Sequence, residues 1–514
     1  MIRQMQHGEF MIDERDHRTR QRQEKRRKNE LIMKCVISAL VLIIVFLTII
    51  LVKDAAIPEV AKWRKEQARK KAAVSQEASL GTGSGNSAGN QGTADGAQDT
   101  GVTGNAQNDT GSQEIETLIG QADRMAAQYD YDGAVALLQS SAEYSGSQQM
   151  QDAVEQYRRV KESCTAYPLD QITHVFFHTM IRDSSKAFDG DEDEAGYNQV
   201  MTTMSEFTGI MQSMYEKGYV MVSLHDMCIV NEDGTVSRGE IRLPPGKIPF
   251  VLSQDDVSYY HYMDGDGFAQ KLVLDENGSV KNSYREDDGT ISIGDYDMVP
   301  WIDTFVDEHP DFSYHGHKGI IALTGYEGVL GYRTDEVYRT REASRVTKYQ
   351  QDFFDANPDF DEAAWQKEVD QAKAVAEAMK ADGWEFASHT WGHISPAARG
   401  IDVTKTDTER WLNNVATVVG STDVIIFAFG ADIGGWEPYT SDNEFFTWFK
   451  QNGFNIYCNV DSSKNWVQFG DTFMRQGRRN LDGYRMYYNP EMLDDLFDVS
   501  AVWDNARPTP VPEM

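Results

Sequence analysis

The stretch from Ile248 to Asp256, "IPFVLSQDD", joins a short apolar run to two adjacent aspartates. An apolar run of this length that ends in polar residues is typical of a buried strand. Adjacent aspartates at a strand end most often cap a helix or a turn. When they are buried, however, they repel each other unless a cation or a proton neutralises them. The stretch therefore predicts a buried strand that carries Asp255 and Asp256 at its carboxyl end.

Similar apolar runs recur along the chain after Pro168, and amphipathic helical segments separate several of them. Strands that alternate with helices predict a parallel α/β architecture. About seven strands suit a closed or nearly closed barrel, whose chemistry lies at the carboxyl ends of the strands. The predicted strands are residues 172–177, 219–223, 248–253, 319–324, 385–388, 424–429 and 455–460.

A second polar motif follows one of these runs. The sequence "EFASHTWGH" places His389 and His393 four residues apart, which puts both side chains on one face of a helical turn. Two histidines and one carboxylate leave coordination positions open for water and substrate, as in a catalytic zinc site. Either motif alone is weak evidence. Both at strand ends of one predicted barrel indicate a metal site.

Together the motifs resemble those of the NodB-like polysaccharide deacetylases of carbohydrate esterase family 4, which pair a strand ending in two aspartates with a later His-Ser/Thr-x-x-His motif. The resemblance covers about residues 168–505 and implies a distorted (β/α)7-type barrel. It implies that Asp255 is the general base and that Asp256, His389 and His393 bind Zn²⁺, or another divalent metal such as Co²⁺. The implied reaction removes N-acetyl or O-acetyl groups from a glycan, with zinc-bound water attacking the acetyl carbonyl and Asp255 taking its proton.

The resemblance also suggests residues that contact the substrate. The segment "IIFAFGADIGGW" lies where the family carries an Arg-x-Pro-Tyr or Tyr-Pro-Tyr-Gly motif. A backbone N–H near Phe429 or Gly430 would help to bind the oxyanion, and Asp432 falls in the same segment. Trp391 and Trp436 are candidates for stacking on sugar rings, although most tryptophans belong to the core.

Two departures from the family pattern concern catalysis. The family supplies a late histidine as general acid, whereas no histidine follows His393 in this chain, and "FAFGAD" lacks the arginine and proline of the third motif. His178, in "FFHTMI", is a candidate acid or a structural residue behind the site. The pair His315 and His317 in "YHGHKG" is spaced like a second metal pair, but a surface loop is the better interpretation.

Three functions therefore stay open at the level of sequence. The first is a zinc-dependent glycan deacetylase. The second is a catalytically impaired relative that only binds glycan, which the missing late histidine favours and the retained Asp255 disfavours. The third is a metal-free barrel glycosidase that would use Asp255 or Asp256 with Glu437. Metal content separates the third from the others, and acetate release separates the first from the second.

The amino-terminal part predicts a membrane anchor. Residues 35–52 form an uncharged apolar stretch, long enough for a transmembrane helix and too long for an ordinary signal-peptide core. Basic residues are more numerous before the span than after it, so we expect a cytoplasmic basic tail at residues 1–34 and an extracellular body. A basic juxtamembrane helix at 53–79 and a disordered Gly/Ser/Asn-rich linker at 80–113 follow.

Charge and local pattern limit the remaining partners. Residues 1–71 hold 17 Lys/Arg and 9 Asp/Glu (net +8), and the remainder holds 32 and 72 (net −40). This polyanionic body excludes nucleic acid as a partner, because phosphate binding needs a basic face. Residues 114–167 predict a helical hairpin that resembles one tetratricopeptide helix pair; it could pack on the barrel or bind an unknown protein partner. An insertion at about 257–318 would shape the substrate groove. Cysteine spacing assigns no disulfide among Cys164, Cys228 and Cys458.

Overall fold

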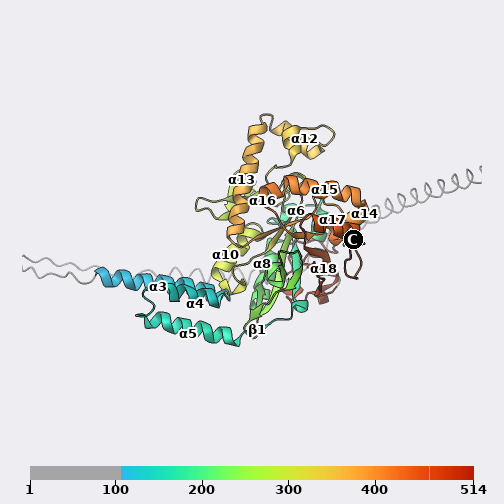
Figure 1. Cartoon of the computed structure of the whole chain (residues 1–514). Coiled ribbons are helices and arrows are strands. Elements are labelled where there is room, and N and C mark those ends of the chain that lie inside the picture. The colour runs from blue at the N-terminus through green and yellow to red at the C-terminus, as the bar shows by residue number, and fades with distance from the viewer. Residues whose placement is uncertain (1–105, 462, 514) are drawn as a thin grey trace, which may run out of the picture. The chain divides into compact units, whose positions relative to one another are not determined.

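The computed structural model describes residues 106–461 and 463–513. At its centre, seven parallel strands pair side by side until the last joins the first, which closes a barrel (Figure 1). The predicted barrel is thus confirmed. In order around the ring the strands are β2 (Thr173–Phe177), β7 (Ile248–Asp255), β11 (Ile320–Leu323), β12 (Glu385–Ser388), β13 (Val424–Ile426), β14 (Ile456–Val460) and β16 (Met474–Asn480).

Side chains along β7 alternate between two separate hydrophobic clusters. In β7, Phe250 and Leu252 belong to the cluster that includes residues of the surrounding helices, and Val251 belongs to the other. Successive side chains of a strand point to opposite faces. Ser253 and Asp255 therefore continue the face of Val251, which is the inside of the barrel.

Two strands differ from the sequence-based expectation. β3 (Tyr219–Met221) pairs with no described strand other than β7 and lies outside the closed ring, so its predicted place in the barrel is wrong. The seventh strand of the ring is β16, which no apolar run in the sequence predicts. All seven residues of β16 are buried, yet its sequence is "MRQGRRN". Its arginines find buried partners instead of solvent, and a hydropathy pattern cannot reveal that pairing.

Amphipathic helices surround the barrel (Figure 1). Residue Thr203 starts α8 with a capping box, in which its hydroxyl accepts from the N–H of Glu206 and the Glu206 carboxylate accepts from the N–H of Thr203. The longer helices of this layer are α8 (Met204–Glu216), α10 (Met298–Glu308), α13 (Glu362–Ala381), α15 (Ile401–Asn414) and α17 (Glu444–Gln451).

Shorter elements complete the described part of the chain. Strands β8 (Lys271–Leu274) and β9 (Val280–Arg285) form a hairpin around Gly278, and β10 (Ile291–Gly294) extends it. The other strands are β1 (Thr165–Ala166), β4 (Cys228–Val230), β5 (Val236–Arg238), β6 (Arg242–Leu243) and β15 (Trp466–Phe469). The remaining α-helices after residue 168 are α6 (Ser184–Ala187), α7 (Glu194–Val200), α9 (Leu224–Met227), α11 (Glu336–Thr340), α12 (Lys348–Ala356), α14 (Pro396–Arg399), α16 (Ala416–Val419), α18 (Gly483–Tyr488) and α19 (Val499–Val502).

Three helices precede the barrel where the sequence predicts a hairpin. They are α3 (Ala106–Ala127), α4 (Tyr131–Ser140) and α5 (Gln148–Ser163). Helix α3 begins inside the predicted disordered linker, so that linker's boundary is wrong by eight residues (106–113); adding residues to an existing helix costs little. Arg124 of α3 forms an ion pair with Asp307, and the Tyr129 hydroxyl donates to the Asp311 carbonyl, so this unit packs beside α10.

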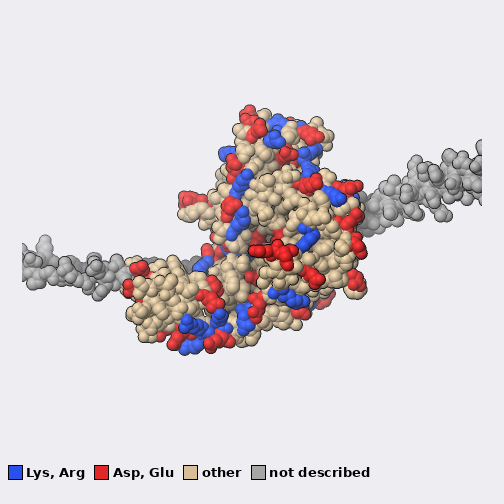
Figure 2. All heavy atoms as spheres, viewed as in Figure 1, with Lys and Arg blue, Asp and Glu red and all other residues tan. Residues whose placement is uncertain are grey.

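The predicted membrane anchor, residues 35–52, lies outside the described residues, as do the tail at 1–34 and the segment at 53–79. Within the described ranges, no helix has both the length and the apolar character needed to cross a bilayer. Cys164, Cys228 and Cys458 are buried free thiols. The face shown in Figure 2 intersperses acidic and basic side chains.

The carboxyl-terminal tail is fastened by a fully buried ion pair. The Arg507 guanidinium donates to both carboxylate oxygens of Glu206, at 3.0 and 2.5 Å, and neither side chain has exposed surface. Removing one partner leaves the other charge buried and uncompensated. We therefore expect Arg507→Met to lower the free energy of unfolding by about 3–5 kcal/mol, measured by chemical denaturation. Replacing the exposed Arg158 with Met is the matched control, and an equal effect of both changes would contradict the role of the pair.

A charged cluster closes the amino end of β12 and β13. His225 contacts Glu385 through Nδ1 at 3.0 Å and Asp423 through Nε2 at 2.9 Å. Burial alone would lower the pKa of His225, but the hydrogen bonds to Asp423 and Glu385 outweigh it and raise the pKa to about 10. The positive charge of His225 therefore joins two strands of the barrel.

This cluster makes the stability of the protein depend on pH. Because the folded pKa of His225 lies above its unfolded value of about 6.5, its contribution is complete below about pH 6.5 and is lost as the pH rises toward about 10. We expect the stability advantage of the wild type over His225→Gln to shrink between these values, as measured by urea midpoints at several pH values. An advantage that stays constant over this range would refute the charged state of His225.

Candidate metal centre

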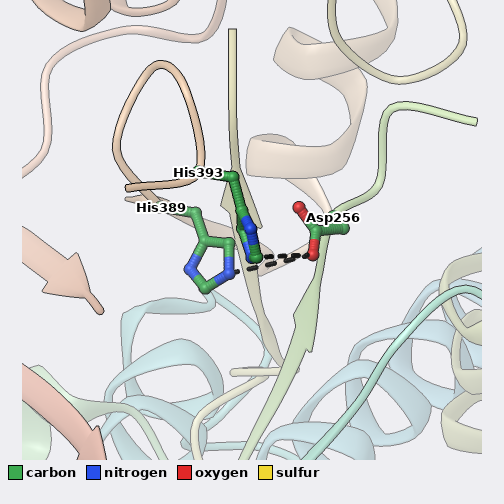
Figure 3. Close-up of side chains that lie close together, drawn as sticks. All are labelled: Asp256, His389 and His393. Atoms are coloured by element: carbon green, nitrogen blue, oxygen red, sulfur yellow. Dashed lines mark ion pairs between the residues drawn. The ribbon is translucent and has the colours of Figure 1, made fainter. Parts of the chain in front are cut away.

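Three of the predicted site residues meet at the carboxyl ends of two barrel strands. Asp256 directly follows β7, and His389 and His393 follow β12. Their ligand atoms all lie within 4.8 Å of one another. Oδ2 of Asp256 is 3.8 Å from Nε2 of His389 and 3.5 Å from Nε2 of His393, and Figure 3 shows the three groups pointing toward one another.

These separations suit a shared ion. Tetrahedral ligands at about 2.0–2.2 Å from zinc lie about 3.4 Å apart, close to the two observed distances. One carboxylate and two imidazoles are also a donor set that zinc accepts in catalytic sites. Burial lowers the pKa of His393, which favours the neutral imidazole that a metal needs. The residues present therefore fit a divalent transition metal.

Neighbouring groups orient two of the three side chains. The Nδ1–H of His389 donates to the carbonyl of Ile426 on β13 at 2.8 Å, which leaves Nε2 free to face the centre. The hydroxyl of Tyr260 donates to Oδ1 of Asp256 at 2.8 Å and leaves Oδ2 free. Such outer hydrogen bonds fix the tautomer and direction of metal ligands.

The backbone at the site adopts conformations that bulky residues rarely take. Asp256, Thr390 and His393 have φ values of 61°, 62° and 49°, in the left-handed region that side chains disfavour. A continued strand would turn the Asp256 side chain away from the inside of the barrel, and its positive φ breaks that alternation. The carboxylate of Asp407 accepts from the N–H groups of Trp391 and Gly392 and so holds the histidine loop. Strain of this kind is common at functional sites.

Asp255 lies beside this triad but has a different partner. Its two oxygens accept hydrogen bonds from the two terminal nitrogens of Arg478, at 2.8 and 2.9 Å, and both side chains are buried. Burial alone would raise the pKa of Asp255; the Arg478 guanidinium, with a smaller contribution from His389, lowers it well below its usual range. Oδ2 of Asp255 lies 3.9 Å from Nε2 of His389. The site thus contains an ionised carboxylate next to, but separate from, the metal-capable group.

Arg478 is the residue of this site that the sequence did not indicate. It lies on the inner face of β16, donates to Ser253 and packs over the ring of Phe176 at 4.0 Å. Nothing local to "MRQGRRN" says that this particular arginine faces inward.

His178 and Gly430 are placed near the site in different ways. His178 follows β2, one residue beyond the register pair Phe177 and Gln254, and is therefore level with Asp255. Its Nδ1–H donates to the carbonyl of Val200 at 3.0 Å, so Nε2 is the nitrogen left for other contacts. The N–H of Gly430 donates to the carbonyl of Phe427 at 3.0 Å and is not free for an oxyanion while that bond exists.

The other residues predicted to contact the substrate differ in their exposure and in their partners. Phe429 is exposed, with its ring centre 4.4 Å from that of His393, and Trp436 is exposed on the same loop. The Trp391 ring instead lies under the Arg410 guanidinium at 3.2 Å and faces the backbone at Gly325. Asp432 forms an ion pair with a buried arginine of β16, Arg475.

The second histidine pair does not form a metal group with the first. The ring of His315 stacks on Tyr314, with centres 4.0 Å apart. His317 lies 3.7 Å from Asp226 and 3.9 Å from Glu385. Glu385 begins β12 whereas His389 follows its end, so the two pairs lie at opposite ends of that strand.

No protein family and no curated protein matches the chain. Among solved structures, the chain is similar to a Streptococcus pyogenes deacetylase, PplD in complex with acetate. The sequence identity is 12% and the TM-score is 0.33, over 63% of this chain and 97% of that chain.

Proposed function

We propose that the chain is a metal-dependent deacetylase acting on an acetylated glycan. One observation carries the proposal: Asp256, His389 and His393 form a metal-capable triad at the carboxyl end of a closed parallel barrel, with the ionised Asp255 beside it. A site for binding alone would not need a second buried carboxylate held ready at this position. An N-acetyl group is the preferred target, and an O-acetyl group is the alternative.

Asp255 would act as the base of this reaction. Zn²⁺ or a similar ion bound by the triad would polarise the acetyl carbonyl and acidify the attacking water. Each carboxylate oxygen has two lone pairs, so Oδ2 of Asp255 can accept a proton while it still accepts from Arg478. The ion pair fixes the direction of that oxygen and lowers the pKa of Asp255, so the carboxylate is ionised and ready to accept a proton near neutral pH.

His178 is our proposed proton donor to the leaving amine, in place of the late histidine. It is level with Asp255 in the strand register, and its bond to Val200 fixes the ring so that Nε2 is available. If His178 has this role, His178→Gln should lower turnover of an amide substrate more than that of an activated ester, whose leaving group needs no proton. Equal losses on both substrates would indicate a structural role.

The two other functions predict different behaviour. A barrel glycosidase needs one carboxylic acid that is protonated near neutral pH and one ionised carboxylate; Arg478 holds the pKa of Asp255 low, so Asp255 could serve only as the ionised partner, and such an enzyme would work without metal. A glycan-binding relative would bind metal and glycan without releasing acetate. The missing late histidine keeps this second function as the competitor to be tested.

The experiment combines metal analysis with product analysis. We expect about one zinc per chain after dialysis and acetate release from chitin, peptidoglycan or acetylxylan fragments by the zinc-loaded protein. Zinc without acetate from any of these substrates would leave only the binding function, and absence of bound metal would reject both. The Asp255→Asn variant controls for acetate from contaminating esterases.

We also propose that residues 35–52 anchor the protein in a cell membrane, with the barrel outside and its glycan substrate in the cell wall. The basic residues before the span and the long linker after it support this arrangement. Protease added to intact cells should then cleave the barrel domain, and protection of that domain until the cells are lysed would reverse the orientation.

A further inference from the structure

The loop that follows β13 presents two unusually exposed aromatic side chains. Trp436 is 77% exposed and Phe429 is 72% exposed, the highest values among large hydrophobic residues in the described ranges, where the others reach at most 50%. Single exposed hydrophobic residues are ordinary, but a concentration of exposed apolar surface marks an interaction site. Both residues belong to one stretch of eight residues that begins at the metal centre.

A buried arginine holds the backbone on either side of Trp436. The Arg475 guanidinium donates to the carbonyls of Gly435 and Glu437, each at 2.9 Å, and forms an ion pair with Asp432. It is 1% exposed and packs over the ring of Tyr439 at 4.0 Å. The loop is therefore fixed from within, and the exposure of the indole is not the result of a loose chain.

Phe429 is fixed in a similar way at the other end of the loop. Its φ of 59° is rare for a bulky residue, and its ring packs edge-on against His393. The next residue, Gly430, leaves no room for a side chain, because a Cβ there would lie 2.3 Å from the side chain of Val460. The fold thus places an exposed phenyl ring directly beside a metal ligand.

The surroundings of the two rings select the kind of partner. Residues 428–444 contain no lysine or arginine; the charge of Asp432 is compensated by Arg475, which leaves Glu437, Asp442 and Glu444 as the acidic residues of this stretch. Glycines lie between the two aromatic residues in the sequence, and the exposed Glu437 follows Trp436. The two rings therefore do not form the continuous apolar face that a protein helix needs. A pyranose ring has an apolar CH face that can stack on an aromatic ring, and polar edges that can contact the acidic residues around the two aromatic rings. An acidic rim repels uronate or phosphate groups and tolerates neutral sugars or free amines.

We propose that Phe429 and Trp436 form a stacking platform for successive sugar rings of a neutral or amine-bearing glycan. The seven peptide units between them span at most about 25 Å, within the length of a short oligosaccharide. The inference rests on the proposed function for the reaction at the metal centre and adds the substrate class: a polymer that is not polyanionic and whose affinity depends on Trp436.

The test measures affinity without turnover. Isothermal titration of the full chain carrying Asp255→Asn, and of metal-free wild type as a second background, would use the N-acetylglucosamine tetrasaccharide, its deacetylated form and a tetragalacturonate. We expect Trp436→Ala and Phe429→Ala each to raise the Kd for the tetrasaccharide by about tenfold. Tyr349→Ala, an exposed aromatic on α12, is the matched control and should not change it. The tetragalacturonate should bind at least about tenfold more weakly.

Three results would overturn the platform: no binding of any neutral or amine-bearing tetrasaccharide, unchanged affinity in both aromatic variants, or preference for the anionic oligosaccharide. The proposed function fails separately. Trp436-dependent binding without acetate release by the zinc-loaded wild type would keep the platform and reject the deacetylase. Acetate release together with unchanged affinity in the aromatic variants would keep the deacetylase and reject the platform.

Discussion

Asp255→Asn is expected to reduce acetate release by about 10²–10⁴-fold, the usual contribution of a general base, while the metal stays bound. The reason is that Asp255 lies outside the triad and contacts Arg478 through both oxygens. An asparagine keeps the shape of the side chain but accepts no proton. Metal content measured after dialysis, together with kcat/KM on the acetylated tetrasaccharide, checks both parts.

Variants of the metal ligands distinguish the roles of the two aspartates. Asp256→Asn and His389→Ala should lose the metal, because the first replaces the only charged ligand of the triad by a neutral amide and the second deletes a ligand group. If Asp255→Asn strips the metal and Asp256→Asn keeps it, the roles of the two aspartates are exchanged. Circular dichroism must show that each variant is folded, since Asp255→Asn also removes the charge that compensates Arg478 inside the barrel.

Arg478→Met is the second change with a large expected effect. It leaves Asp255 buried without its cation, and breaking a buried ion pair costs about 3–5 kcal/mol of stability. It also removes the main cause of the low pKa of Asp255, so that burial raises this pKa above the ordinary value. The base is then protonated at a higher pH, and the acid limb of the kcat/KM profile should move to higher pH.

The stability of this variant should depend on pH in the opposite sense to the wild type. In the wild type the folded pKa of Asp255 is depressed, so its contribution is present above about pH 4 and is lost as the pH falls through the folded pKa. In Arg478→Met the raised pKa makes lower pH favourable, because protonation removes the unpaired charge. Urea midpoints of Arg478→Met measured at pH 4–8 should therefore rise as the pH falls. An unmoved acid limb would mean that Arg478 does not control Asp255.

A double variant distinguishes loss of folding from loss of chemistry. Asp255→Asn with Arg478→Met removes both charges, and replacing a whole buried pair by uncharged groups is often close to neutral. We expect the double variant to be more stable than either single variant but as inactive as Asp255→Asn. Recovery of activity in the double variant would contradict the assignment of Asp255 as base.

The sequence by itself determined the fold class and the residues of the triad. Apolar runs at 248–253 and 385–388 predicted two barrel strands, and the polar residues after them predicted a metal site because parallel strands bring their carboxyl ends together. Six of the seven ring strands were visible in this way. A strand that is buried on both faces must be apolar unless it finds polar partners, and for these six the rule holds.

Tertiary structure decided what the local pattern could not contain. β16 is buried although it carries three arginines, because Asp432, Asp255 and Asp495 form ion pairs with Arg475, Arg478 and Arg479. The pairing of Arg478 with Asp255 joins residues 223 positions apart, so no periodicity or spacing reports it. The same reason applies to Trp391 and Trp436: one indole is packed under Arg410 and the other faces solvent. Hydropathy gives both tryptophans the same value, and only the surrounding chain determines which of them a substrate can reach.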